Sequence, residues 1–107
     1  MTITEIQENA RIFAPIFKDK TPEQRMLYLT SEVGEVSLEV LKLEGFRQGG
    51  EDQDQLKENL GMEIYDVVWN LCDLANMFDI DLADAFQKKV AFNNQRWEKR
   101  KTEAPNK

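Results

Sequence analysis

The apolar residues in the middle of the chain recur every three or four positions, which is the period of one face of an α-helix. They form two apolar seams, Leu29, Val33, Val36, Val40 and Leu43, then Ile64, Val67, Leu71, Leu74 and Phe78. No stretch of useful length shows the alternation of apolar and polar residues that is typical of a β-strand. The pattern therefore predicts an all-α protein in which each of two long helices buries an apolar seam.

Prolines, glycines and capping residues divide the chain into four predicted helices, which cover residues 3–13, 22–43, about 54–78 and about 82–100. The clearest start is Thr21, with Pro22 at the first helical position and Gln24 three residues after the cap. Asp81 is the expected N-cap of the last helix. A chain of 107 residues has room for one domain. We therefore expect a single four-helix, bundle-like module.

The residue types that are missing exclude several classes of site. The chain has no histidine and one cysteine, Cys72, which we expect to be a small core residue. This excludes catalytic triads, HExxH zinc sites, di-iron sites with Glu-x-x-His motifs, cysteine-rich metal sites and an internal disulfide. A net charge of −6 argues against broad binding of nucleic acid. With no signal sequence and no membrane-spanning run, we expect a cytoplasmic protein that binds neither nucleic acid nor membranes.

Acidic residues stand one position before the apolar ones on both central helices. The rows are Glu32, Glu35 and Glu39 on the first of these helices and Glu63, Asp66, Asn70 and Asp73 on the second. Residues three or four apart share a helix face, and a solvated flank is the usual role of such a row. For Glu39 and Asp73 that role and a role in a site remain open. Glu63 and Asp66 lie in a segment that is apolar on its other faces too, so we expect them to be partly buried.

Buried carboxylates need a partner of opposite charge. Two neighbouring helices would bring together the pairs Glu32/Glu35 and Glu63/Asp66, with few bases nearby. Ligands that are all oxygen favour Mg²⁺ or Mn²⁺ over zinc and copper. Spacing alone thus predicts a site for a hard divalent cation.

The predicted fourth helix has basic residues on one face. Lys89, Asn93 and Arg96 are spaced by four and three positions, with Trp97 beside them. A solvated basic face near a helix C-terminus is the ordinary role of such residues. Next to a metal and carboxylate cluster, they would instead bind a polyphosphate.

Three elements, in this order, resemble the MazG-like, all-α nucleoside triphosphate pyrophosphohydrolases. They are Glu32-Val-Gly-Glu35 with Glu63-Ile-Tyr-Asp66, the segment 74–85, and Lys89-Val-Ala-Phe-Asn93-Asn-Gln-Arg96-Trp97. The resemblance covers roughly residues 21–97. It implies that residues 1–97 form one such domain and that residues 98–107 are a polar tail. Many members have a second glutamate where this chain has Ser31.

The resemblance implies Mg²⁺-dependent hydrolysis of nucleoside triphosphates, with deoxynucleoside triphosphates as expected substrates, to monophosphate and pyrophosphate, in the clean-up of nucleotide pools. Mn²⁺ is a possible substitute. The implied metal ligands are Glu32, Glu35, Glu63 and Asp66, one of which would also orient or deprotonate the attacking water. Lys89, Asn93 and Arg96, with Trp97 beside them, would hold the triphosphate and sugar, and Asn70 would face the nucleoside. Trp69, Phe46 and Phe17 are candidates for stacking on the base, although core or interface packing is the commoner role for each.

Members of this length resemble one another in forming homodimers or dimers of dimers. The apolar surface of the third helix agrees, because it exceeds what one four-helix monomer can cover. We therefore expect a homodimer or homotetramer with sites near the subunit interface. Two alternatives remain: a related activity on phosphoribosyl-ATP, and a non-catalytic oligomerisation or regulatory module whose acids are merely solvated.

Overall fold

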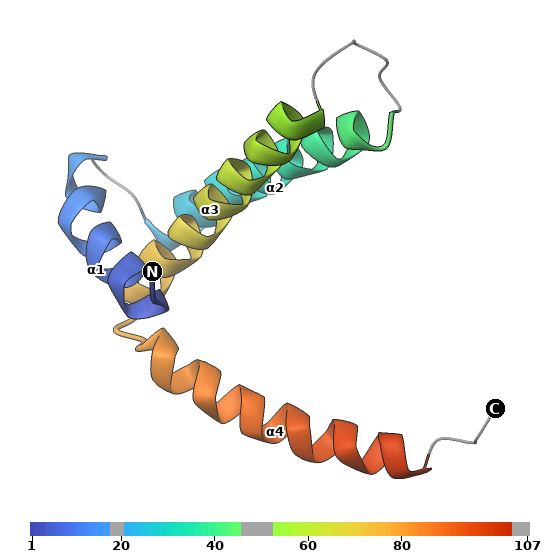
Figure 1. Ribbon diagram of the computed structural model, residues 1–107. Coiled ribbons are helices and arrows are strands. Elements are labelled where there is room, and N and C mark those ends of the chain that lie inside the picture. The colour runs from blue at the N-terminus through green and yellow to red at the C-terminus, as the bar shows by residue number, and fades with distance from the viewer. Residues whose placement is uncertain (18–20, 46–52, 104–107) are drawn as a thin grey trace.

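The computed structural model describes residues 1–17, 21–45 and 53–103, and over these ranges the chain is helical with no strand (Figure 1). The helices are α1 (Ile3–Phe13), α2 (Pro22–Leu43), α3 (Gln53–Met77) and α4 (Leu82–Glu103), with a short 3₁₀ helix, η1 (Ala14–Ile16), after α1. The predicted all-α class with four helices is confirmed. The last helix extends to Glu103, beyond its expected end. Most of the segment between the second and third predicted helices and the last four residues of the predicted tail lie outside the described ranges.

Local capping explains why two of the helices begin where they do. At the start of α2, the N–H of Gln24 donates to Thr21 Oγ1 at 3.1 Å, and the N–H of Thr21 donates to Gln24 Oε1 at 2.9 Å. At the start of α4, the N–H of Ala83 donates to Asp81 Oδ1 at 3.0 Å. Each cap satisfies N–H groups that have no partner inside the helix. Both predicted N-caps are therefore confirmed.

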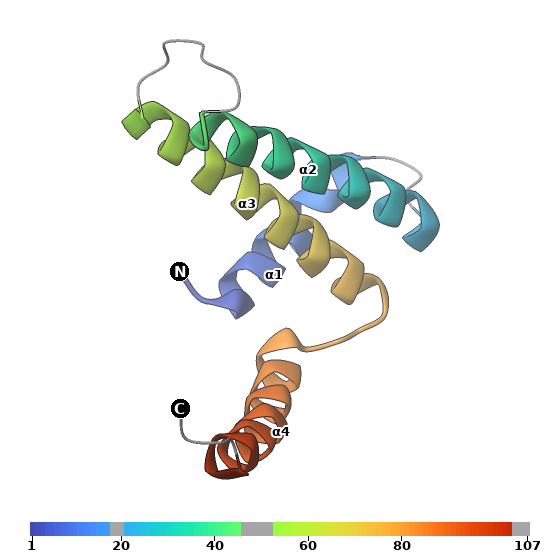
Figure 2. The same cartoon turned by 90° about the vertical axis from the view of Figure 1, so that its right-hand side faces the viewer.

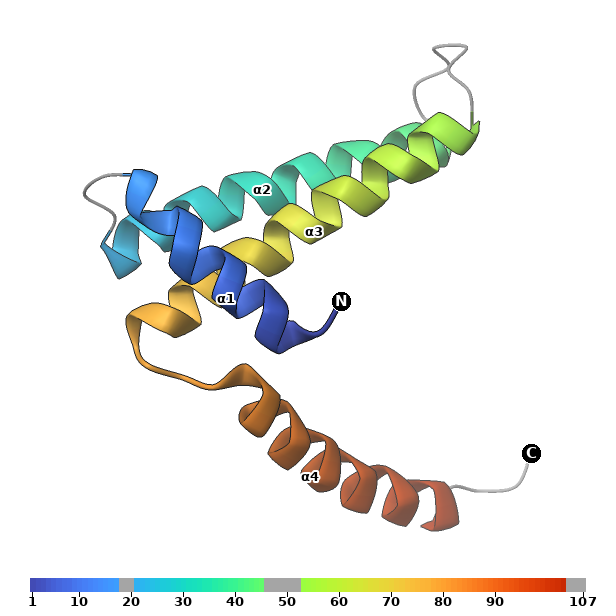
Figure 3. The ribbon, with the colours of Figure 1, turned by 60° about the vertical axis from the view of Figure 1, so that its left-hand side comes forward.

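The helices α2 and α3 lie side by side and antiparallel, while α1 crosses α3 (Figure 2). After a short turn, α4 leaves the end of α3 and packs mainly against α1 (Figure 3). Its C-terminal half extends away from the α2–α3 pair (Figure 1). One chain thus forms a three-helix body with a projecting fourth helix.

The face that α2 turns towards α3 differs from the predicted apolar seam. From position 25 onwards, it consists of the buried and half-buried residues Arg25, Leu29, Glu32, Val36, Glu39, Lys42 and Leu43. It includes three seam residues, but Val33 and Val40 are 47% and 42% exposed. On α3, Ile64, Leu71 and Phe78 are exposed as well. The prediction was wrong for these five residues, because the helices meet between their apolar and acidic rows and so enclose acidic side chains.

Several large apolar side chains remain uncovered in the single chain. On α4, Phe86, Val90, Phe92 and Trp97 are all at least half exposed, and no residue of this helix is buried. By contrast, Cys72 is fully buried, as expected for a small core residue. None of the helices in the described ranges has the length and hydropathy needed to cross a membrane.

Candidate functional site

Three carboxylates from α2 and α3 meet on one side of the helix pair. One oxygen each from Glu32, Glu63 and Asp66 lies within 4.8 Å of the other two. Glu63 and Asp66 are three residues apart on α3, and the antiparallel α2 supplies Glu32. In the single chain Glu32 and Glu63 are half-buried, whereas Asp66 is exposed, contrary to the expectation that it is partly buried. These three residues are called the acidic cluster below.

The acidic cluster has no basic partner in the part of the chain that the structure describes. The ion pairs Arg11–Glu8, Arg25–Asp73, Lys42–Glu39 and Lys88–Asp84 all lie outside it. Burial raises the pKa of Glu63, and the charges of Asp66, Glu32, Glu35 and Glu39 raise it further. Carboxylate oxygens that lie close together, repel one another and lack a basic partner suit a hard divalent cation. The donor set therefore fits Mg²⁺ or Mn²⁺.

The other acids of the two rows have different surroundings. Glu35 is exposed and lies outside the acidic cluster, although its charge contributes to the raised pKa of Glu63. Glu39 is half-buried, with an oxygen 3.5 Å from Lys42 Nζ. Asp73 is 4% exposed and pairs with Arg25. Neither Glu39 nor Asp73 is thus a simple solvated flank, because each has a base beside it.

A pocket of about 320 Å³ opens beside the acidic cluster. Glu32 and Asp66 belong to the cluster and also line the pocket. Its remaining lining residues are Asn9, Phe17, Arg25, Tyr28, Tyr65, Trp69 and Asn70. The rings of Phe17 and Trp69 meet edge to face, with centroids 6.1 Å apart. The carboxylates therefore border an aromatic pocket whose volume is at the lower end of the range for small-molecule sites, roughly 300–1,000 Å³.

A buried polar network joins the wall of this pocket to the acidic cluster. Arg25 Nε lies 2.7 Å from Asp73 Oδ2, and Arg25 Nη1 donates to Asn70 Oδ1. Asn70 Nδ2 in turn donates to the backbone carbonyl of Asp66 at 2.7 Å. Asn70 thus lies in the pocket wall, where its amide bridges Arg25 and the Asp66 backbone.

Sequence reasoning missed four residues of the pocket: Asn9, Arg25, Tyr28 and Tyr65. A signal for two of them was present, because Arg25, Tyr28 and Glu32 are spaced by three and four positions and so continue the acidic row of α2. The charge of Glu32, then burial and a hydrogen bond to Glu32, raise the pKa of Tyr28. Of the aromatic candidates for base stacking, Phe17 and Trp69 line the pocket, and Phe46 lies outside the described residues.

The predicted phosphate-binding residues lie on α4, outside both the acidic cluster and the pocket of the same chain. Lys89 and Arg96 both lie over the ring of Phe92, with Lys89 Nζ and Arg96 Cζ 5.0 and 5.4 Å from its centroid. This agrees with the shared face that their spacing predicted. Asn93 is half-buried, and Trp97 is 54% exposed. A single chain therefore does not bring these four residues to the carboxylates.

Residues 20–100 match the model of the MazG nucleotide pyrophosphohydrolase domain. The match includes the acidic cluster and the basic face of α4, whereas α1 precedes it. No curated protein and no solved structure matches the chain. Because the matched residues make up most of its 107 residues, the chain belongs to the MazG nucleotide pyrophosphohydrolase family.

Proposed function

We propose that the protein hydrolyses nucleoside triphosphates to monophosphate and pyrophosphate, with Mg²⁺ as cofactor. The observation that carries this proposal is the position of the unpaired acidic cluster beside an aromatic pocket. The cluster offers oxygen ligands for the cation, and the pocket offers a surface for a base. Family membership supports the reaction class.

The four predicted acids have two different roles in the proposed reaction. Glu32, Glu63 and Asp66 hold the cation, for which Mn²⁺ is a substitute with the same preference for oxygen. When bound, the ion supplies positive charge against the phosphate oxygens. Glu35 lies one turn beyond Glu32 and outside the acidic cluster, so we assign it the orientation and deprotonation of the attacking water. In a chain without histidine, a carboxylate is the natural base.

The pocket binds the base of the substrate. The rings of Trp69 and Phe17 offer apolar faces and edges against which a base stacks. Arg25 Nη2 is buried without a hydrogen-bond partner among the described residues. Because a buried donor without a partner is costly, a base carbonyl oxygen in the pocket would stabilise it. We propose deoxynucleoside triphosphates as substrates, as in the clean-up of nucleotide pools.

A second copy of the chain supplies the phosphate-binding residues. Helix α4 carries six basic and three acidic side chains, whereas α2 and α3 together carry nine acidic and three basic ones. Exposed apolar residues on all three helices, such as Val33, Ile64 and Phe86, favour association. In the proposed homodimer or dimer of dimers, Lys89, Asn93, Arg96 and Trp97 of one protomer serve the acidic cluster of another.

Mixing two inactive variants tests whether the site is shared. We expect Asp66→Asn, and the double variant Lys89→Ala/Arg96→Ala at triphosphate concentrations below the wild-type KM, each to be nearly inactive alone, because each damages both sites of a dimer. After unfolding and refolding together, mixed dimers contain one intact site, and activity returns to about a quarter of the wild-type value for random pairing of a two-fold dimer. If all of these residues serve the site of their own chain, the refolded mixture stays inactive.

Substitution of Lys89 or Arg96 by alanine is expected to raise the KM for triphosphate by about tenfold or more, because a lost ionic contact to phosphate costs at least about 1.4 kcal/mol. The Mg²⁺-dependent rise in melting temperature should persist, since the acidic cluster is intact. Steady-state kinetics and thermal denaturation measure the two effects. Lys88→Ala is the matched control, because Lys88 pairs with Asp84 on the same helix. An equal loss of Mg²⁺ and triphosphate binding would show that Lys89 and Arg96 are structural.

The direct test of the proposed function is pyrophosphate release from a panel of ribo- and deoxynucleoside triphosphates and phosphoribosyl-ATP, with Mg²⁺ or with EDTA. We expect release from at least one triphosphate in Mg²⁺ and none in EDTA, and the panel then ranks the bases. Release from phosphoribosyl-ATP alone would redirect the proposal to that substrate. No release from any of these compounds by folded protein would leave a non-catalytic module.

A further inference from the structure

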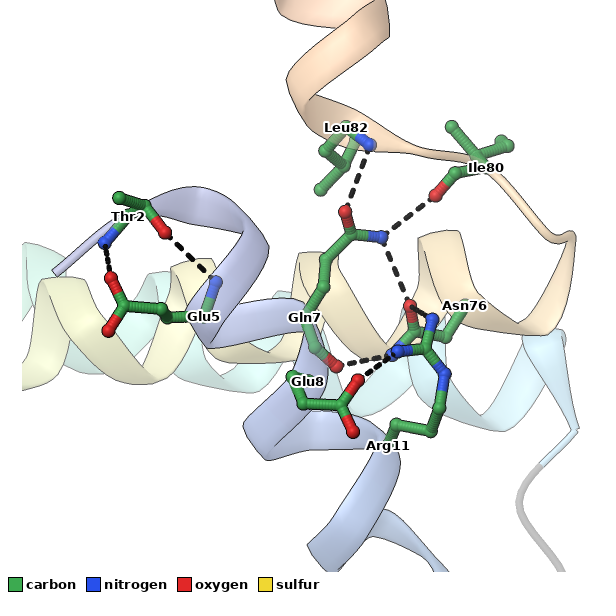
Figure 4. Close-up of polar contacts among 8 residues, drawn as sticks. All are labelled: Thr2, Glu5, Gln7, Glu8, Arg11, Asn76, Ile80 and Leu82. Carbon is green, nitrogen blue, oxygen red and sulfur yellow. Dashed lines mark hydrogen bonds and ion pairs between the residues drawn. The ribbon is translucent and has the colours of Figure 1, made fainter.

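Gln7 of α1 is a buried amide that holds the turn between α3 and α4 (Figure 4). Its Nε2 donates to Asn76 Oδ1 at 3.0 Å and to the carbonyl of Ile80 at 2.8 Å. Its Oε1 accepts the N–H of Leu82 at 2.9 Å. One side chain from the start of the protein thus bonds to the end of α3, to the turn and to the first residue of α4.

Asn76 makes the contact reciprocal. Its Nδ2 donates to the backbone carbonyl of Gln7 at 2.9 Å, and its Oδ1 also accepts from Arg11 Nη2 at 3.3 Å. Gln7 and Asn76 are therefore joined across 69 positions of sequence by two hydrogen bonds, one between their side chains and one from the Asn76 side chain to the Gln7 backbone. Gln7 and Asn76, with these bonds, are called the amide clasp below.

Two polar groups at the junction of the turn and α4 bond to α1. Asp79 has a left-handed backbone with φ of 55°, and the N–H groups of Asp79 and Ile80 bond back to the last turn of α3. Asp81 caps the N–H groups of Ala83 and Asp84. Gln7 bonds to two further groups, the N–H of Leu82 and the carbonyl of Ile80. The amide clasp thus completes the cap of α4 from outside the helix.

We infer that Gln7 is a positioning residue: the amide clasp sets the direction in which α4 leaves α3, and so the place of the phosphate-binding face of α4. This inference rests on the proposed function for the role of that face. Helix α4 packs mainly against α1, so the clasp is where its direction is determined. The clasp acts from α1, which lies before the residues that match the family model.

The length of α4 amplifies any change at the clasp. Arg96 lies 14 residues beyond Leu82, or about 21 Å along the helix at roughly 1.5 Å per residue. A tilt of about 10° at Leu82 would therefore move Arg96 by roughly 4 Å. Displacements of this size exceed what the positioning of reacting groups tolerates. Loss of the clasp should consequently weaken triphosphate binding without any change in the acidic cluster.

The test combines a distance measurement with kinetics on the full-length protein. Spin labels on Lys57→Cys in α3 and Gln95→Cys in α4 report the direction of α4 by pulsed electron paramagnetic resonance, with labelled protein diluted in unlabelled protein. Cys72 can stay, because it is fully buried and burial raises the pKa of its thiol. Gln7→Leu removes all three hydrogen bonds of the Gln7 side chain. Asn76→Ala, the second variant, removes both bonds between Gln7 and Asn76.

We expect Gln7→Leu to shift or broaden the distance distribution by several ångströms and to raise the KM for triphosphate about tenfold, with the Mg²⁺-dependent rise in melting temperature unchanged. Asn76→Ala should act in the same direction, and it decides the test if Gln7→Leu fails to fold. Thr2→Ala is the matched control, because it breaks the capping box with Glu5 at the N-terminus of α1 and leaves the clasp intact. It should change neither the distance nor KM.

The outcomes separate the inference from the proposed function. An unchanged distance distribution in folded Gln7→Leu and Asn76→Ala would overturn the inference, even if the wild-type enzyme is active. Equal KM changes in Gln7→Leu and Thr2→Ala would also overturn it, because both would then reflect loss of α1. A shifted distance in a protein whose wild type releases no pyrophosphate would support the role of the clasp in orienting α4 and refute the function instead.

Discussion

Substitution of Asp66 by asparagine should abolish the stabilisation that Mg²⁺ gives to the wild-type protein and lower the rate of hydrolysis by at least about 100-fold. At a Mg²⁺ concentration of tenfold Kd, the wild type should gain about 1.4 kcal/mol of unfolding free energy. For a domain of this size, that gain is a rise in Tm of roughly 6 to 11 °C. Glu63→Gln should have the same effects, because Glu63 and Asp66 are neighbours in the acidic cluster. Thermal denaturation in Mg²⁺ and in EDTA measures the stabilisation.

When the metal is removed, Asp66→Asn and Glu63→Gln should raise the melting temperature relative to the wild type instead of lowering it. Without a cation, the repulsion that helps to raise the pKa of Glu63 destabilises the fold. Both variants should therefore melt at a higher temperature than the wild type in EDTA. Glu58→Gln, an exposed acid on the same helix, is the control and should respond to Mg²⁺ as the wild type does. A wild-type Tm that millimolar Mg²⁺ leaves unmoved would contradict the metal site.

Glu35→Gln should separate binding of the cation from chemistry. If Glu35 serves the attacking water, this variant keeps the Mg²⁺-dependent rise in Tm and loses hydrolysis. If it loses the rise as well, Glu35 is a fourth ligand of the ion, as the family resemblance implied.

The second large effect is expected at the buried ion pair between Arg25 and Asp73. Arg25→Met leaves the carboxylate of Asp73 buried without its partner, because the two side chains are only 3% and 6% exposed. Loss of one partner of a buried pair costs about 3–5 kcal/mol, which is a fall in Tm of at least about 12 °C. Urea denaturation followed by circular dichroism measures this loss.

Two further variants test whether the loss of stability in Arg25→Met comes from the unpaired buried charge. The exposed pair Arg11–Glu8, with side chains 59% and 58% accessible, should contribute at most about 1 kcal/mol. Glu8→Gln is therefore the reference, because it removes this charge pair and leaves the bond between Arg11 and Asn76 in place. The double variant Arg25→Met/Asp73→Leu should recover most of the lost stability, since it leaves no charge without a partner. Equal losses of stability in Arg25→Met and Glu8→Gln would show that burial of the Arg25–Asp73 pair makes no difference to its contribution.

The helices could be predicted from the sequence because their signals are local. The start of α2 is fixed within four residues, by Thr21, Pro22 and Gln24. The start of α4 is capped by Asp81, which accepts from an N–H group two positions further on. The acids of the cluster could be located too, because spacings of three and four place them on one face of each helix. These features need no knowledge of distant contacts.

The interfaces between helices could not be predicted in the same way. The apolar and acidic rows are one position apart, or about 100° around the helix axis. Periodicity alone does not say which part of this wide face the neighbouring helix covers, and Val33 and Val40 proved to be exposed. Arg25 is an ordinary surface residue type, and only α3 gives it Asp73 and Asn70 as partners. The direction of α4 depends on Gln7 and Asn76, which are 69 positions apart. Each of these features is set by contacts that local periodicity does not encode.

The most direct measurement is the identification of products by ³¹P nuclear magnetic resonance for the best triphosphate of the panel, with wild type and Glu63→Gln, in Mg²⁺ and in EDTA. We predict equal amounts of nucleoside monophosphate and pyrophosphate from the wild type in Mg²⁺, and unchanged triphosphate in the other three samples. Diphosphate with inorganic phosphate, or the same products from Glu63→Gln or in EDTA, would contradict a pyrophosphohydrolase that works through the acidic cluster.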